Sequence, residues 1–249
     1  MSIPKIIHYC WFGGGGQIPL EYISYIDNWK RILPDYEFIR WDESNCDIHI
    51  NAFVEKAYKA RKWAFISDYF RLKALYEYGG IYLDTDVEVQ KSFDELLQYK
   101  AFVGYIWDCL IGTAVIGAEK ESEMIRELLL WYEHKEDFEL IPNNHLLTDY
   151  FIKQPWFRLD GRTLIHENVA VFCKETFEIP PLFGKGYSIH HIANSWHDEK
   201  KVNTVKKLLK RIIPYRVWRQ LGAYKALKMN DYYLEYRKVR REHGNDYDK

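Results

Sequence analysis

The sequence predicts an α/β fold, and three segments near its start carry that prediction. Residues 5–12 form a short, mostly apolar run that is typical of a buried strand. In residues 20–33, apolar side chains recur at helical spacing until Pro34 ends the pattern. Residues 36–41 predict a second short strand. A strand, a helix and a strand of these lengths form a βαβ unit, so we expect the first strands of the sheet to be parallel.

The remaining predicted elements are again both helices and strands, as expected for an α/β fold. Residues 52–78 predict a helix in two pieces, which Gly79 and Gly80 end. Residues 81–89, IYLDTDVEV, predict the third strand. Beyond them we expect strands at 101–105 and 113–117, helices at 121–134 and from 142, short strands and turns over 158–191, and helices from residue 200, broken at Pro214. The predicted division is a domain of residues 1–199 and a basic helical tail of residues 200–249.

Charge is unevenly distributed along the chain, although the net charge is only -1. Residues 200–249 contain 15 Lys and Arg against 5 Asp and Glu, and the rest of the chain is correspondingly acidic. An acidic body argues against an extended nucleic-acid surface. Residues 206–221 combine basic side chains with leucines, isoleucines and Trp218. This pattern is compatible with a helix on an anionic membrane, and equally with a helix packed on the body whose basic face is solvated.

Cysteine usage and hydropathy predict an intracellular protein. Cys10, Cys46, Cys109 and Cys173 form no CxxC pair, so we expect free thiols rather than a zinc ribbon or a thioredoxin-like motif. The first residues lack the architecture of a signal peptide, and no apolar run reaches the roughly 18 residues that span a bilayer. The expected location is cytoplasmic, with at most a peripheral contact to the inner face of the membrane.

The strongest chemical feature is the Asp84-Thr85-Asp86 sequence at the end of the third predicted strand. On a strand, Asp84 and Asp86 point to the same face about 7 Å apart, and a turn of the backbone would bring them closer. Ligands of open α/β sheets bind at the carboxyl ends of strands. Carboxylate oxygens suit Mg²⁺ or Mn²⁺, which bridge to phosphate oxygens. The simpler alternative is a solvated strand end, because a bare DxD is common.

Asp68 and Arg71 are three residues apart on the preceding helix and therefore share a face. They predict either an ordinary intrahelical ion pair or two groups at the edge of the sheet. At that edge, Asp68 would accept hydrogen bonds from sugar hydroxyls and Arg71 would offset charge near a diphosphate. His190, His191 and His197 invite a zinc interpretation, but adjacent histidines on a strand point to opposite faces. The simpler interpretation is that one of them is a packed or surface histidine.

The run WAFISDYFRLKALYEYGGIYLDTDVEV, residues 63–89, resembles the DxD-containing glycosyltransferases of the capsular polysaccharide type, a family 32-like group. That group includes yeast-type initiating mannosyltransferases, and glucosylating toxins are more distant relatives. Three further segments agree in the correct order: PKIIHYCWFGG at 4–14, IGTAVIGAEK at 111–120 and YSIHHIANSW at 187–196. The resemblance covers about residues 3–197.

The resemblance implies a GT-A fold, with a Rossmann-like, mixed and mostly parallel sheet flanked by helices. It also implies a nucleotide-sugar donor, expected to be UDP-linked, a Mn²⁺ or Mg²⁺ ion, and retention of configuration at the anomeric carbon. The corresponding acceptor would be a growing surface polysaccharide or a lipid-linked oligosaccharide. A toxin-like protein glycosyltransferase and a non-catalytic nucleotide-sugar or glycan-binding module are the alternatives.

The resemblance also implies roles for residues in its first three segments. Trp11 would stack on the nucleotide base, and Asp68 and Arg71 would hold the donor sugar. Asp84 would contact the ribose, the sugar or a metal-bound water, or join the metal ligands, and Asp86 would bind the metal directly. These four charged residues are the expected catalytic set.

Roles in the closing segment are less constrained by the resemblance. Ser195 and Trp196 would reach the diphosphate, with Ser195 or Asn194 near the metal. His191 is the candidate third ligand, by analogy with other metal-dependent transferases. Toxin-like relatives have an acidic residue near this segment, and residues 187–196 contain none, which leaves the third protein ligand open.

Overall fold

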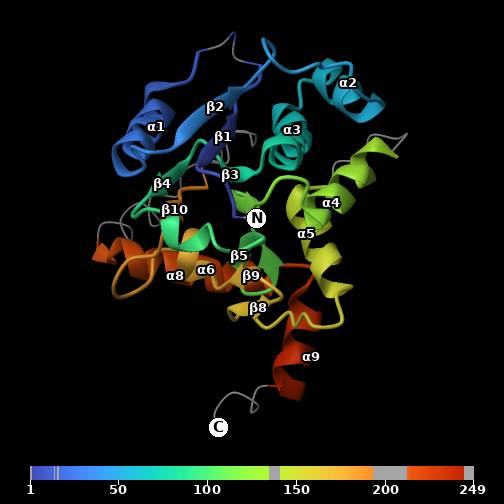
Figure 1. Cartoon of the computed structure of the whole chain (residues 1–249). Coiled ribbons are helices and arrows are strands. Elements are labelled where there is room, and N and C mark those ends of the chain that lie inside the picture. Colours follow the sequence, from blue (N-terminus) through green and yellow to red (C-terminus); the bar gives the residue numbers. More distant parts are fainter. Residues whose placement is uncertain (1, 14, 16, 135–140, 193–211, 244–249) are drawn as a thin grey trace.

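The structure is a computed structural model, which describes residues 2–13, 15, 17–134, 141–192 and 212–243. Its strands run through the middle of the molecule and its helices surround them (Figure 1). The first half contains β1 (Ile6–Cys10), α1 (Leu20–Ile32), β2 (Glu37–Trp41), α2 (Ala52–Lys59), α3 (Trp63–Tyr78), β3 (Gly80–Leu83), β4 (Val87–Val89) and the short 3₁₀ turn η1 (Asp94–Leu96). The second half contains β5 (Ala101–Trp107), β6 (Leu110–Ile111), β7 (Val115–Ala118), α4 (Glu123–Glu133), α5 (Asn143–Ile152), β8 (Leu164–His166), β9 (Val169–Phe172), α6 (Lys174–Phe177), β10 (Ser188–His190), α8 (Tyr215–Lys228) and α9 (Tyr233–His243).

The central sheet is mixed, as predicted, with parallel and antiparallel pairs. Its strand order is β2-β1-β3-β7-β5-β9-β8, with β6 paired to β5. The pairs β1–β2, β1–β3 and β5–β9 are parallel, and the pairs made by β7 and β8 are antiparallel. The opening βαβ unit and its parallel strands are therefore confirmed. Parallel strands place their carboxyl ends at one edge, so β1 and β3 both end where the Asp84-Thr85-Asp86 sequence begins.

The prediction of one continuous strand over residues 81–89 is wrong. The backbone turns after β3, where the Val87 N–H donates to the Asp84 carbonyl at 3.0 Å. The strand β4 then leaves the central sheet and pairs antiparallel with β10 in a separate two-stranded sheet. Trp29 of α1 contributes to this turn, because its Nε1–H donates to the Val87 carbonyl at 2.6 Å. Alternating sequence predicts extended backbone equally on both sides of such a turn, so the break is set by tertiary contacts.

The predicted stop at Gly79 and Gly80 is confirmed and has a steric cause. Both glycines have positive φ angles, 67° and 112°. A Cβ at Gly80 would lie 2.7 Å from the Ile6 carbonyl oxygen of the neighbouring strand. Glycine is the residue that adopts this backbone at little cost. The chain can therefore pass from α3 directly into β3 beside β1.

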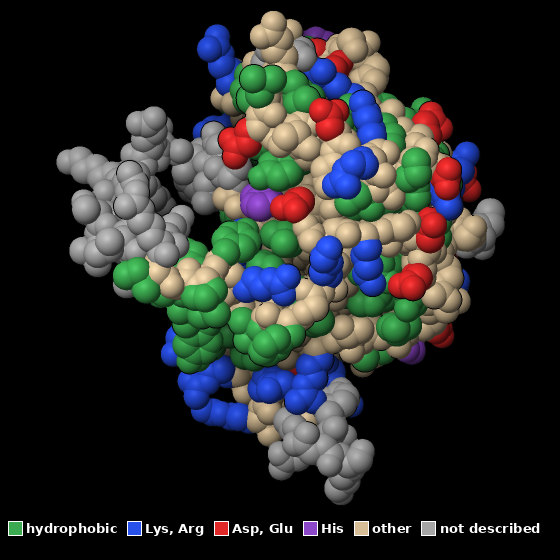
Figure 2. Space-filling model, turned by 90° about the vertical axis from the view of Figure 1, so that its left-hand side faces the viewer, with side chains coloured by type: hydrophobic (Ala, Val, Ile, Leu, Met, Phe, Trp, Pro, Cys, Tyr) green, Lys and Arg blue, Asp and Glu red, His purple; other side chains and the backbone are tan. Residues whose placement is uncertain are grey.

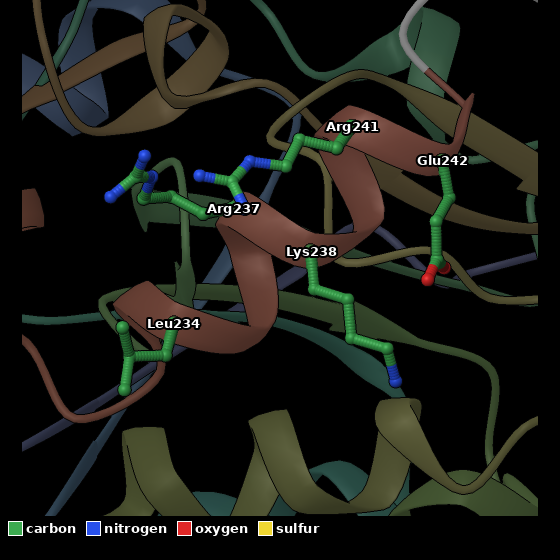
Figure 3. A pocket seen from close by; sticks show the side chains of 5 residues that line it. All are labelled: Leu234, Arg237, Lys238, Arg241 and Glu242. Carbon is green, nitrogen blue, oxygen red and sulfur yellow. The ribbon is translucent and has the colours of Figure 1, made fainter.

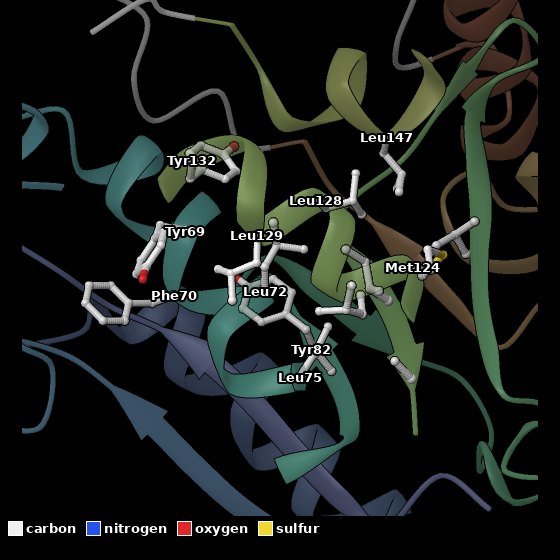
Figure 4. Packing of buried hydrophobic residues seen from close by; sticks show 14 of the residues in the cluster. Tyr69, Phe70, Leu72, Leu75, Tyr82, Met124, Leu128, Leu129, Tyr132 and Leu147 are labelled. Atoms are coloured by element: carbon white, nitrogen blue, oxygen red, sulfur yellow. The ribbon is translucent and has the colours of Figure 1, made fainter. Parts of the chain in front are cut away.

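Hydrophobic residues cover both faces of the sheet. In β3, Ile81 and Leu83 belong to the cluster that includes α1, whereas Tyr82 between them belongs to the cluster of α2 to α5. On the second face α3 packs against α4, with Leu72 and Leu128 among the buried residues that Figure 4 shows. This double packing fixes the position of α3, the helix that carries Asp68 and Arg71.

The basic tail is helical where the structure describes it. Helix α8 begins just after Pro214, and its Ala223 and Leu227 are buried against the body, whereas α9 buries no residue. The predicted domain boundary near residue 199 lies outside the described residues. None of the described helices is long and apolar enough to cross a membrane. All four cysteines are free, as expected, and three of them are buried.

Candidate active site

Two carboxylates and one imidazole converge at the carboxyl edge of β3. One ligand atom each from Asp84, Asp86 and His190 lies within 4.8 Å of the others. Asp84 and Asp86 flank the turn after β3, and His190 ends β10. The His190 Nε2 is 3.3 Å from Asp86 Oδ1. Carboxylates suit Mg²⁺ and Mn²⁺, and an imidazole nitrogen is a ligand of first-row transition ions, so this set of atoms fits Mn²⁺ better than Mg²⁺.

The histidine that approaches the two carboxylates is His190, whereas the sequence prediction was His191. The imidazole of His191 lies on the other side of the strand, with Nε2 at 3.0 Å from Glu88 Oε2. Its ring also stacks on Tyr25 with centroids 4.9 Å apart. The expectation that the adjacent histidines face opposite ways is confirmed. The candidate metal ligand is therefore His190 in place of His191.

Glu178 holds the His190 ring from behind. The carboxylate oxygen Oε2 of Glu178 is 2.6 Å from His190 Nδ1, and Glu178 is only 1% exposed. Burial by itself lowers the pKa of His190, but the Glu178 charge and the hydrogen bond with Asp86 together raise it well above its ordinary value. A carboxylate on one ring nitrogen fixes the orientation of the other, which here points at Asp86. Sequence reasoning missed Glu178, because no motif or spacing links it to the Asp84-Thr85-Asp86 sequence.

The backbone fixes the strand that carries His190. The N–H of His191 donates to the Asp86 carbonyl at 3.0 Å, which ties β10 to the turn after β3. On the far side, the Arg219 guanidinium of α8 donates to the His190 carbonyl at 2.6 Å. The candidate ligand is therefore held by elements from three separate parts of the chain.

Arg71 bridges two carboxylates beside this group. Its Nη2 lies 3.0 Å from Asp68 Oδ1 and 3.3 Å from Asp84 Oδ1, and its Nη1 donates to the Thr113 carbonyl at 2.8 Å. The guanidinium also lies 4.5 Å from the centre of the Tyr82 ring, and the Tyr82 hydroxyl donates to Asp84 Oδ1 at 2.9 Å. The predicted shared face of Asp68 and Arg71 is confirmed, but the pair is buried rather than solvated.

Burial and the neighbouring groups together set the electrostatics of this pair. It raises the pKa of Asp68 to about 6, although the Arg71 charge opposes the shift. Burial also lowers the pKa of Arg71, but Asp84, Tyr82 and Asp68 together outweigh that and hold it above its usual range. Arg71 therefore keeps a fixed positive charge in direct contact with Asp84, one of the candidate metal ligands.

Trp11 lies just after β1, at the same edge of the sheet as Asp84. Its Nε1–H donates to the Gln17 carbonyl at 3.0 Å, and its ring lies 5.4 Å from that of Tyr22. The stacking of Trp11 on a nucleotide base stays a prediction. Asn194, Ser195 and Trp196, the other predicted contacts of the diphosphate and the metal, lie outside the described residues.

A shallow hollow elsewhere on the molecule has a different character. It lies along α9 and is lined by Leu234, Arg237, Lys238, Arg241 and Glu242 (Figure 3). Its side chains come from one exposed helix and bring together no group of metal ligands. The candidate active site is therefore the group of metal-ligand side chains at the turn after β3, and not this hollow.

The comparisons with known proteins agree with that choice. Residues 19–103 match the family described as "Glycosyltransferase sugar-binding region containing DXD motif". The matched segment includes α3, β3 and both aspartates of the turn. This chain carries a DXD glycosyltransferase region.

Relatives of the DXD glycosyltransferase region are found in yeast and in humans. Inositol phosphoceramide mannosyltransferase 3 of Schizosaccharomyces pombe is 32% identical over 136 residues, which are 51% of this chain and 36% of that protein. Inositol phosphoceramide mannosyltransferase 1 of the same yeast is 27% identical over 226 residues, or 79% of this chain and 63% of that protein. The human alpha-1,4-N-acetylglucosaminyltransferase is 25% identical over 200 residues, or 68% and 54% of the two chains. This chain thus spans between about a third and two thirds of the length of these relatives.

Among solved structures, "PaToxG Glycosyltransferase" aligns with a TM-score of 0.48 and 19% identity. The alignment covers 61% of this chain and 69% of that one.

Proposed function

We propose that this protein is a metal-dependent, retaining glycosyltransferase that uses a nucleotide-sugar donor. The observation that carries the proposal is the group of Asp84, Asp86 and His190 beside the Arg71 bridge, whose two aspartates and arginine lie inside the matched DXD glycosyltransferase region. The donor is proposed to be UDP-linked and the cation to be Mn²⁺. Two of the relatives are named for inositol phosphoceramide, a lipid, which supports a lipid-linked acceptor over a protein acceptor. Such an acceptor, or a growing surface polysaccharide, would be met at the cytoplasmic face of a membrane.

Asp84, Asp86 and His190 would hold the cation, and Ser195 or Asn194 would complete the set. A bound divalent ion stabilises the negative charge that develops on a departing diphosphate. Arg71 keeps the Asp84 carboxylate in place through Oδ1 and supplies a fixed positive charge nearby. Asp68, on the other side of Arg71, is the proposed acceptor of hydrogen bonds from the sugar hydroxyls.

The proposed reaction exchanges one bond at the anomeric carbon for another. The bond from that carbon to the diphosphate oxygen breaks, and a hydroxyl oxygen of the acceptor takes its place on the same face. The acceptor proton goes to the leaving diphosphate oxygen. No protein side chain is assigned as a nucleophile, because the leaving diphosphate oxygen itself accepts the proton of the acceptor.

A donor panel tests the proposal. The purified protein is incubated with Mn²⁺ and each common UDP- or GDP-sugar, and released nucleotide is measured. We expect release from one donor that stops with a chelator and in Asp86→Ala, while Asp231→Ala, an exposed carboxylate of the tail, behaves as wild type. Release that persists in Asp86→Ala would refute the site. Donor binding by thermal shift without turnover, even with added acceptors, would instead support the non-catalytic module.

A further inference from the structure

One side of helix α8 attaches it to the body of the protein. Ala223 and Leu227 are buried there, at 3% and 4% exposure. Arg219 donates to the His190 carbonyl, and the Gln220 amide donates to Glu175 Oε1 at 3.2 Å. Residues three, four and seven positions apart lie on one side of a helix, so this side is fully occupied by contacts with the rest of the chain.

A second side of α8 carries an exposed stripe of apolar side chains. Val217, Leu221 and Tyr224 are 37%, 54% and 56% exposed. Their spacing of four and three residues places them in one stripe, which Lys228 continues. A surface helix normally turns polar residues to solvent and apolar residues to the core. Here the outward stripe is apolar, which marks it as a contact surface.

A loop adds two more apolar side chains beside the start of α8. Leu182 is 51% exposed and Phe183 is 90% exposed. The Arg216 guanidinium closes the loop beneath them, because its Nη1 donates to the carbonyls of Pro181 at 3.0 Å and Gly184 at 2.7 Å. Two large apolar side chains are thus presented to solvent on a loop that an arginine of α8 holds.

The charge around this stripe is positive. Helix α8 contains four Lys and Arg and no Asp or Glu. Together with the residues up to His243, the basic side chains number eight against three acidic ones. Figure 2 shows hydrophobic side chains gathered on this face of the molecule, with Lys and Arg side chains below them. Apolar side chains with a basic surround are typical of helices that lie in the interface of an anionic bilayer.

We propose that this surface docks on an anionic phospholipid membrane. It consists of Leu182, Phe183, Val217, Leu221 and Tyr224, and we refer to it as the α8 face. The apolar side chains would enter the interfacial region, while Lys225 and Lys228 extend toward the lipid headgroups. Charge complementarity favours this occupant, because the α8 helix has no acidic residue to repel an anionic surface.

The α8 face is joined directly to the candidate active site. The inward side of the same helix holds β10, through Arg219 and through the Tyr215 hydroxyl, which lies 3.5 Å from His191 Nδ1. Docking would therefore keep the His190 ligand at a fixed position relative to the lipid headgroups. This consequence, delivery of a lipid-linked acceptor, rests on the proposed function, whereas membrane binding itself does not.

Vesicle flotation tests the proposal on the full chain. Phosphatidylcholine vesicles with and without phosphatidylglycerol are compared, and salt is varied. We expect binding that needs phosphatidylglycerol and weakens with salt. The double variant Leu182→Ser with Phe183→Ser, and separately Leu221→Ser, should each weaken it by at least about ten-fold, because they remove buried apolar area. Leu234→Ser, which removes a leucine of α9 that is 76% exposed, is the matched control and should bind as wild type.

Two further measurements distinguish a failure of membrane binding from a failure of the proposed activity and from unfolding of a variant. Nucleotide release without vesicles reports on the proposed function alone and should be the same in all these variants. Thermal denaturation shows that each variant is folded. The proposal is overturned if wild type does not bind anionic vesicles at low salt, or if the α8-face variants bind as well as Leu234→Ser. It is also overturned if mass measurement shows a dimer that Leu221→Ser dissociates, because the α8 face would then cover a second copy.

Discussion

Asp68 is a buried carboxylate that pairs with Arg71 at 3.0 Å, and burial raises its pKa to about 6. An unfolded chain would show a value near 3.9. A pKa that is higher in the folded state favours folding below the unfolded pKa, and this contribution is lost as the pH rises through the folded pKa. The ion pair therefore does not fully offset the desolvation of the Asp68 charge.

The prediction concerns Asp68→Asn, which removes this ionisation. Between about pH 4.5 and pH 8, the free energy of unfolding of wild type should fall relative to the variant by about 2 kcal/mol. Urea denaturation across that range measures it. Asp231→Asn, an exposed position, serves as the control. A difference between Asp68→Asn and wild type that does not change with pH would contradict the assigned burial cost.

Glu178 acts on the candidate metal site through His190 and would not touch the ion. Carboxylates in this position typically change metal affinity by about 10–100-fold. We expect Glu178→Gln to weaken Mn²⁺ binding within that range, measured by the electron spin resonance signal of free Mn²⁺. The matched control is Glu88→Gln, because Glu88 pairs with His191 on the opposite side of the strand. Equal affinities of the two variants would remove the positioning role of Glu178.

At the scale of elements, the sequence predicted helices and strands well and the turn after β3 poorly. Periodicity identified α1, α2 and α3 because apolar spacing and glycine stops are local signals. The break between β3 and β4 depends on Trp29 and on pairing with β10, which lies about a hundred residues later. Glu178 could not be predicted for the same reason, because it is far in sequence from the aspartates whose site it supports. The same separation also explains why alternation predicted that His190 and His191 diverge but could not say which one faces Asp86.

Gly80 and Gly222 make a pair in which the same substitution should have opposite effects. At Gly80, φ is +112° and a Cβ would meet the Ile6 carbonyl oxygen at 2.7 Å. Gly80→Ala should therefore destabilise the protein by about 1–3 kcal/mol. At Gly222, inside α8, a Cβ meets nothing within 4 Å, so Gly222→Ala should stabilise it by about 0.5–1 kcal/mol. Both are read by urea denaturation, and a stable Gly80→Ala protein would show that the helix-to-strand junction tolerates a shift.

At the scale of the whole molecule, the candidate site depends on segments that are far apart in the sequence. The aspartates follow β3, the imidazole ends β10, and α8 holds β10 from behind. Helix α8 is itself seated in a small cluster, where Leu227 packs with Cys109 and Leu110. Part of the predicted basic tail thus contributes to the packing that positions the site. Composition could not predict this contact. It separates the tail from the body by charge, whereas the contact depends on a few apolar residues of α8.

Leu227 and Leu221 test that arrangement on a single helix. Leu227 is 4% exposed in the cluster with Cys109, whereas Leu221 is 54% exposed on the α8 face. Leu227→Ala should lower the free energy of unfolding by about 2–5 kcal/mol, because it removes buried apolar volume and leaves a cavity. Leu221→Ala should change it by less than about 0.5 kcal/mol. Both are measured by urea denaturation in the absence of lipid. If Leu227→Ala left stability unchanged, α8 would not be part of the folded body, and its hold on β10 would lose its basis.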